Sequence, residues 1–191
     1  NICYLHGWGR DSQDFKGIMD VFPGMAIDLP GFGKTKPSSV SLSPLDYAIQ
    51  LNNILPNEIT TIVGHSFGGR VAVHLSLLRN IQNLVLVAVP LIKIKKPNKS
   101  INKLTLFKKL YRYGLISKSN LESVKNKMGS ADYRNSNGVM RETLVKAVND
   151  DLHEKVWLIQ SKVFLIWGEN DTEVPVSVAN EANLLINNSQ L

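Results

Sequence analysis

The feature that most constrains the fold is a serine turn between an apolar run and a helical pattern. The run Ile59 to Val63 is followed by Gly64-His65-Ser66-Phe67-Gly68, and helical spacing begins directly after the serine. A G-x-S-x-G pentapeptide in this context predicts a sharp strand-to-helix turn with the serine hydroxyl above the end of the strand. There the hydroxyl faces the amino terminus of the helix, which favours developing negative charge. The alternative is a small-residue turn in which the serine is incidental.

Apolar runs and helical stretches alternate along the chain. The predicted strands are Ile2–Leu5, Gly24–Leu29, Ile59–Val63, Leu84–Val89 and Val163–Trp167. The predicted helices are Ser12–Phe22, Pro44–Leu55, Phe67–Leu78 and Val176–Ile186. None of the strand-like runs alternates with polar residues, as expected for strands buried on both faces of a parallel sheet. The pattern predicts an α/β fold with a doubly wound, mostly parallel sheet.

One long segment interrupts this alternation. Residues 93–155 are charged and helix-prone, without a clear strand. We interpret them as a helical cap inserted into a core of residues 1–92 and 156–191. The total of 191 residues is typical of one globular domain.

The basic character of the chain is concentrated in that segment. The net charge is +6, but residues 93–127 hold eleven Lys or Arg and one acid, Glu122, so the rest of the chain is at −4. Basic residues spread along the whole chain would have suggested binding of nucleic acid, which is not expected here. The segment is either the solvated face of amphipathic helices or a surface that attracts an anionic substrate, a carrier protein or a membrane.

The remaining composition limits location and cofactors. A single cysteine, Cys3, with no secretory segment and no long apolar run predicts a cytoplasmic protein without a transmembrane span. Four scattered histidines lack the spacing of metal ligands, so no metal is expected. Gly33-Lys34-Thr35 lacks the first glycine of a phosphate-binding loop, and no cofactor is expected.

Two further segments end near the same edge of the predicted sheet. His6-Gly7-Trp8-Gly9 follows the first strand, and its turn can aim a backbone N–H into the crevice above the sheet. The backbone N–H groups of Trp8 and Phe67 would then form an oxyanion hole, with His6, Gly7, Gly64 and Gly68 supporting the turns. Asp171, beyond the last strand, is placed to orient a histidine, with Glu169 and Glu173 as alternatives.

Taken in order, these motifs resemble the α/β-hydrolase superfamily. They are His6-Gly7-Trp8-Gly9, Asp28-Leu29-Pro30-Gly31-Phe32-Gly33, the serine pentapeptide and Trp167-Gly168-Glu169-Asn170-Asp171. The pattern is similar to small bacterial carboxylesterases of the pimeloyl-carrier-protein methyl esterase type and to the menaquinone-pathway synthase on the same scaffold. The resemblance implies Ser66 as nucleophile, Asp171 as acid and Trp8 with Phe67 as the oxyanion hole. A serine nucleophile disfavours the dehalogenase and epoxide hydrolase branches.

The histidine of the implied triad has no match in this chain. The superfamily places it after a further strand, which would begin near Asn188, where the chain ends. His65 lies inside the turn, His74 is more than two helical turns away, and His6 belongs to the first turn. His153 could reach Ser66 only if the cap brought it over the sheet. We therefore expect an incomplete chain of an enzyme, with terminal strands missing, that is nearly inactive as given.

The functional prediction is a serine carboxylesterase. It would cleave a small or medium acyl ester or thioester through an acyl-enzyme on Ser66. An anionic or carrier-bound acyl group would suit the basic cap. The alternatives are a binding module that keeps the crevice without catalysis, and a C–O lyase that uses the same triad.

Overall fold

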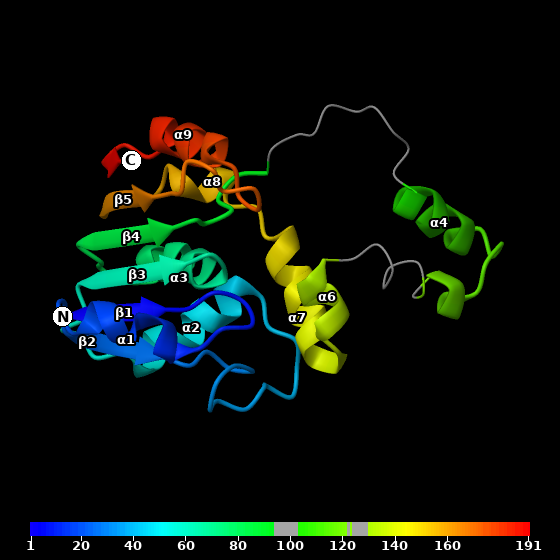
Figure 1. The fold of residues 1–191 in the computed structure, drawn as a ribbon, viewed down its shortest axis with the longest axis horizontal. Helices are drawn as coiled ribbons and strands as arrows, with labels where there is room; N and C mark the ends of the chain where they lie inside the picture. Colours follow the sequence, from blue (N-terminus) through cyan, green and yellow to red (C-terminus); the bar gives the residue numbers. More distant parts are fainter. Residues whose placement is uncertain (94–102, 122, 124–129) are drawn as a thin grey trace.

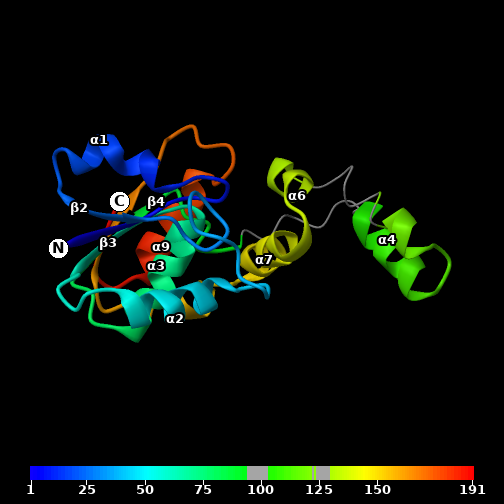
Figure 2. The same ribbon diagram turned by 90° about the horizontal axis from the view of Figure 1, so that it is seen from below.

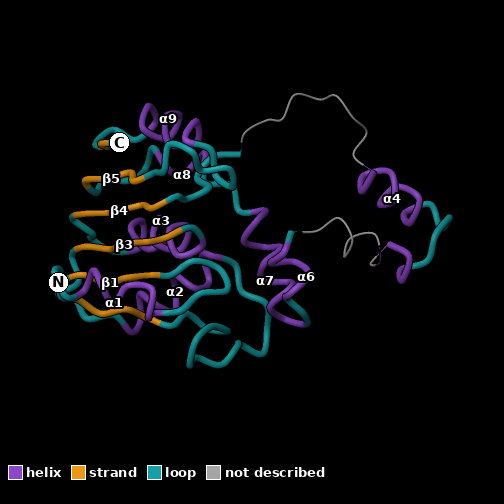
Figure 3. The backbone as a smooth tube through the Cα atoms, in the orientation of Figure 1, coloured by secondary structure: helices purple, strands orange, loops and turns teal. Residues whose placement is uncertain are grey.

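A six-stranded sheet forms the centre of the molecule (Figures 1 and 3). The computed structural model describes residues 1–93, 103–121, 123 and 130–191. The strand order is β2-β1-β3-β4-β5-β6, and every neighbouring pair is parallel. The strands are β1 (Ile2–Leu5), β2 (Gly24–Ile27), β3 (Thr61–His65), β4 (Asn83–Val87), β5 (Lys162–Ile166) and β6 (Ser189–Gln190). The predicted α/β fold with a mostly parallel sheet is confirmed.

Helices cover both faces of this sheet. Figure 2 shows α1 (Lys16–Met19) on one side of the strands and α2 (Pro44–Ile54) on the other. The second helix packs against α3 (Phe67–Leu78), and α9 (Val176–Leu185) follows β5. Ser43 and Asp46 explain where α2 begins, because each side chain accepts a hydrogen bond from the backbone N–H of the other. Pro44 occupies the first helical position, where no N–H is needed.

The sheet core is built from the apolar runs that the sequence marks. Ile62, Leu84 and Leu86 of the central strands have no measurable exposure. The strand after Ile59 begins two residues later than predicted, at Thr61, and continues through His65, which pairs with Val87. This shift keeps β3 in register with β4 up to the residue before Ser66. The strand therefore places Ser66 directly at the carboxyl end of the sheet.

The helix predicted over Ser12–Phe22 is shorter than expected and begins as a 3-10 turn. The segment forms a 3-10 turn, η1 (Ser12–Phe15), followed by the single helical turn of α1. The Asp11 side chain accepts a hydrogen bond from the Gln13 N–H at 2.9 Å and so starts the tighter turn. Pro23 cannot continue a helix, and the residue before it avoids helical geometry.

The segment between β4 and β5 contributes helices in its described parts. They are α4 (Lys103–Arg112), α6 (Ala131–Asn135), α7 (Gly138–Asn149) and α8 (His153–Val156). Within the predicted cap, residues 94–102, 122 and 124–129 lie outside the described part of the chain. Figures 1 and 2 show α6 and α7 beside the carboxyl end of the sheet, with α4 further away. The carboxyl ends of the strands thus face α7.

Over the described ranges, no helix combines the length and the apolar character that crossing a membrane requires.

Candidate active site

Ser66 lies at a strained turn between β3 and α3. Its backbone angles are φ 47° and ψ −108°, a left-handed region that side chains other than glycine rarely adopt. Two bonds hold the turn: the Ser66 N–H donates to Val87 O at 3.0 Å, and the Gly68 N–H donates to His6 O at 3.0 Å. The turn is therefore tied to β4 on one side and to the loop after β1 on the other.

The close approach at this turn requires small residues. A methyl group at Gly64 would lie 2.6 Å from Gly69 Cα, and one at Gly68 would lie 2.6 Å from His6 O. Real Cβ atoms essentially never come this near to backbone atoms. The glycines that flank Ser66 in sequence thus let α3 start directly against β1 and β3.

Ser66 opens into a cavity of about 790 Å³ between the sheet and α7. Trp8, Ser66 and Phe67 line it on the sheet side, and apolar side chains of α7 line it opposite, namely Leu144, Ala147 and Val148. The Trp8 ring meets Phe67 and Phe32 edge-on, with ring centroids 5.2 and 5.0 Å apart. A second, more polar cavity of about 630 Å³ shares Trp8 and Asp132 with the first. The serine therefore faces a mostly apolar chamber that a small or medium acyl group could fill.

The turn after β1 is fixed by His6, which is fully buried. The Leu29 N–H donates to His6 Nε2 at 3.1 Å, so Nδ1 carries the proton and donates to Gly7 O at 2.8 Å. The backbone N–H groups of Trp8 and Phe67 donate no hydrogen bond to any described residue. Two donors near Ser66 are thus left for a ligand or solvent.

Asp171 lies in the loop after β5 and organises that loop. Its Oδ1 accepts hydrogen bonds from the N–H groups of Glu173 and Val174, both at 2.9 Å. The described residues that line the Ser66 cavity include Glu173 and Val174, but not Asp171 itself. The electrostatic influence of Asp171 reaches His65 and favours its charged form, although burial has the larger effect and lowers the pKa of His65. Because β3 and β5 run in the same direction, Asp171 and the serine turn both lie at the carboxyl end of the sheet.

No histidine in the described ranges forms a hydrogen bond with the Ser66 hydroxyl. The His65 ring packs over Gly7, where an added methyl group would lie 2.7 Å from His65 Nδ1. His74 bonds to Asp150. His153 is half exposed and contacts only the neighbouring Glu154 through its ring. The structure thus brings Ser66, Trp8 and Phe67 together without placing a histidine base on the serine.

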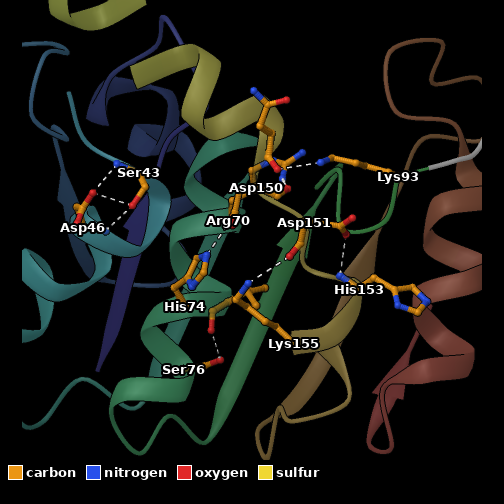
Figure 4. A network of polar contacts seen from close by, with 12 residues as sticks. Ser43, Asp46, Arg70, His74, Ser76, Lys93, Asp150, Asp151, His153 and Lys155 are labelled. Carbon is orange, nitrogen blue, oxygen red and sulfur yellow. Dashed lines mark hydrogen bonds and ion pairs between the residues drawn. The ribbon is translucent and has the colours of Figure 1, made fainter. Parts of the chain in front are cut away.

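The sequence interpretation missed a buried polar network that joins α3 to the end of α7 (Figure 4). Arg70 Nη1 donates to Asp150 O at 2.6 Å, and His74 Nε2 lies 2.9 Å from Asp150 Oδ2. Lys93 Nζ donates to Asn149 O at 2.8 Å. The available signal was the pair Arg70 and His74, four residues apart on one face of an otherwise apolar helix.

Electrostatics favour a charged carboxylate in this network. Burial alone would raise the pKa of Asp150, but the hydrogen bond and charge of His74, with Lys155 and Arg70, hold the pKa below its usual value. Burial lowers the pKa of Arg70, and Asp150 and Asp151 oppose that effect. Because Arg70 also lines the Ser66 cavity, the network links the helix that carries the serine to the helix that covers it.

Asp150→Ala is expected to lower the free energy of unfolding by about 2 kcal/mol, because it leaves the buried His74 without its carboxylate partner and removes a negative charge near Arg70, which keeps its bond to the backbone carbonyl. The value comes from chemical denaturation of the purified chain. Glu142→Ala, which removes an exposed acid from the same helix, is the matched control and should change stability little. Equal stability of the two variants would contradict a role for the network in fixing α7.

The loop after β2 is held by Asp28. Its carboxylate accepts hydrogen bonds from the Ser12 N–H at 2.7 Å and the Lys34 N–H at 2.8 Å. These bonds, first that from Lys34, lower the pKa of Asp28 from 3.8 to about 2. The loop carries Phe32 against Trp8. Asp28 therefore supports one wall of the site.

The stabilisation from Asp28 is expected to depend on pH. Because its folded pKa is depressed, the contribution is complete above pH 3.8 and is lost as the pH falls towards 2. Asp28→Asn should therefore be less stable than the wild type near neutral pH, and the difference should shrink over that acid range. Thermal unfolding of both proteins across the range measures this. A constant difference, or the same effect from Asp20→Asn at an exposed site, would contradict it.

Within the described ranges, no three His, Cys, Asp or Glu side chains come together as a cluster able to hold a metal ion.

Solved structures share this fold. An esterase from Exiguobacterium antarcticum superposes with a TM-score of 0.70 at 17% identity, covering 100% of this chain and 81% of that chain. MenH from S. aureus gives a TM-score of 0.64 at 22% identity, covering 99% of this chain and 82% of that chain. At these identities the likeness concerns the fold.

One curated protein matches part of this chain at higher sequence identity. A pimeloyl-[acyl-carrier protein] methyl ester esterase from Pseudoalteromonas atlantica is 36% identical over 97 residues. The match covers 46% of this chain and 36% of that relative, so this chain spans about a third of the length of the curated protein it matches.

One protein family has a model that matches most of the chain. The model of the alpha/beta hydrolase family matches residues 4–175, a range that contains the turn after β1, the serine turn and Asp171. Together with the parallel sheet and the strained turn at Ser66, this match shows that the chain belongs to the alpha/beta hydrolase family.

Proposed function

We propose that this chain carries the nucleophile and acyl site of a serine carboxylesterase. The observation that carries the proposal is Ser66, held at φ 47° where the strand turns into α3 and open to a chamber lined by α7. Backbone strain of this kind clusters at functional sites, where the strained conformation is part of the mechanism. The name of the curated relative, a methyl ester esterase, supports ester chemistry.

In the proposed reaction, Ser66 Oγ attacks the carbonyl carbon of an ester or thioester. The proton of the Ser66 hydroxyl passes to a base, which is a histidine in the triad that the family resemblance implies. The C–O or C–S bond to the leaving group then breaks, and the leaving group departs with the electron pair of that bond and takes the proton from the base. The Trp8 and Phe67 N–H groups, which have no partner among the described residues, would stabilise the negative charge on the carbonyl oxygen. Hydrolysis of the resulting ester of Ser66 by water completes the cycle. The acyl part would lie against Leu144, Ala147 and Val148.

The proposed role of Asp171 is to orient a histidine base. None of the histidines in the described ranges contacts the Ser66 hydroxyl, so the 191-residue chain is proposed to act slowly. A second candidate, a binding module that uses the chamber without turnover, is favoured by this same observation. The two differ in whether Ser66 becomes acylated.

Acyl-enzyme trapping tests the proposal. p-Nitrophenyl butanoate has a leaving group that needs no protonation, so acylation can proceed on the oxyanion hole alone, while deacylation without a base is slow. Mass spectrometry should then find a butanoyl group on the peptide that contains Ser66. Ser130 lines the same cavity, and Ser130→Ala should still be labelled. Labelling at other residues only, or none at all, would favour the binding module.

A further inference from the structure

The surface around α4 combines exposed apolar and basic side chains. We call the α4 surface the set Lys108, Lys109, Tyr111, Arg112, Tyr113, Leu115 and Lys118. Tyr113 is 74% exposed, Leu115 is 69% exposed and Tyr111 is 42% exposed. Large apolar side chains at such exposure, within five consecutive residues, indicate a surface that contacts a binding partner.

Charge restricts what can cover it. No acidic residue occurs in the sequence between Glu58 and Glu122, so the four bases of the α4 surface have no local acid. None of these bases forms an ion pair with a described residue. A partner must therefore supply negative charge and accept apolar side chains together.

The geometry distinguishes among such partners. Gly114, at φ 72°, lies just after the end of α4, where the Leu115 N–H donates to Leu110 O at 2.8 Å, so Tyr113 and Leu115 lie in the turn that follows the helix. Figures 1 and 2 both show α4 away from the sheet, in a position open to a large partner. A second copy that docked the same surface would bring bases against bases, which is unfavourable.

We infer that the α4 surface binds an anionic phospholipid membrane. Tyr and Leu enter the interface between headgroups and acyl chains, where an amphipathic ring is stable. Lys108, Lys109, Arg112 and Lys118 pair with lipid phosphates, and each adds attraction near a negatively charged leaflet. The inference concerns attachment to the membrane and does not depend on the esterase activity proposed above.

Vesicle co-sedimentation tests it with the intact 191-residue chain. Binding to phosphatidylcholine vesicles that contain phosphatidylglycerol should be at least about tenfold tighter than binding to pure phosphatidylcholine. High salt should weaken it, because exposed charges are screened. Ser66→Ala should bind vesicles like the wild type, so a failure of this inference is separate from a failure of the proposed function. Equal affinity for both vesicle types would overturn the inference.

Two matched pairs of variants locate the contact. Lys108→Glu/Lys109→Glu/Arg112→Glu should lose binding, whereas Lys16→Glu/Lys34→Glu/Lys36→Glu, an equal charge change at exposed sites, should keep most of it. Tyr113→Ser/Leu115→Ser should weaken binding about tenfold or more, and Val40→Ser/Ile54→Ser should not. Circular dichroism confirms that each variant is folded.

A protein partner at the α4 surface, in place of a membrane, would give different results in these experiments. Binding of a purified acidic acyl-carrier protein without binding of anionic vesicles would replace the membrane with a protein partner. Self-association in sedimentation velocity that the α4 variants abolish, again without vesicle binding, would assign the surface to a second copy. Either result overturns the inference.

Discussion

Added imidazole is expected to accelerate ester hydrolysis by this chain, and Ser66→Ala is expected to remove the acceleration. No described histidine contacts the Ser66 hydroxyl, so the basal rate should be low. Losing the histidine of a triad costs on the order of 10⁶ in kcat. A small base that enters the cavity of about 790 Å³ can take the proton of Ser66 and later activate water. We expect a gain of about 10²-fold, at the lower end for a positioned general base.

The measurement is release of p-nitrophenol at increasing imidazole concentration. Imidazole also cleaves such esters in solution, so the rate for Ser66→Ala at the same imidazole concentration is subtracted. Saturation of the Ser66-dependent rate would indicate that imidazole binds in the cavity. A gain that Ser66→Ala retains in full would instead favour the binding module. Robust turnover without imidazole that His65→Ala or His153→Ala abolishes would mean that the base is already in this chain.

The sequence predicted the elements that depend on local patterns. The helix after the serine begins at Phe67 and ends at Leu78, as the apolar spacing predicts. The parallel arrangement of the sheet was predicted from the buried runs, because such runs suit a parallel sheet, but the order of its strands was not. The predicted helix over Ser12–Phe22 begins as a 3-10 turn and ends early, at Met19, ahead of Pro23, which cannot continue a helix. The further strand was expected to begin near Asn188, and Ser189 and Gln190 do pair with β5 there.

The parts of the site that depend on distant contacts were not predictable. Arg70 and Asp150 are 80 residues apart in sequence, and nothing local pairs them. Leu42 N–H donates to Thr143 Oγ1 at 3.1 Å across 101 residues, which anchors the middle of α7. Helical propensity can predict that α7 exists but not which face meets Ser66. That orientation follows from these tertiary contacts, and it decides which side chains line the cavity at Ser66.

The second large effect is expected at Gly68, where α3 begins against β1. A methyl group there would overlap the carbonyl oxygen of Leu5 and lie 2.6 Å from that of His6, the same oxygen that accepts the Gly68 N–H. Because both obstacles are backbone atoms of a buried strand and turn, neither can move aside cheaply. Gly68→Ala should therefore lower the free energy of unfolding by about 3 kcal/mol, or Tm by about 6–12 °C.

Gly17→Ala is the matched control for this substitution. Gly17 lies in α1, and nothing comes within 4 Å of an added methyl group. Alanine restricts the unfolded chain more than glycine does, so Gly17→Ala should raise stability by about 0.5 kcal/mol. The same change from glycine to alanine is thus expected to lower the free energy of unfolding at Gly68 and to raise it at Gly17. The difference comes from the backbone atoms of Leu5 and His6, which crowd the added methyl group at Gly68. Calorimetry that finds Gly68→Ala as stable as the wild type would contradict the close packing of α3 on β1.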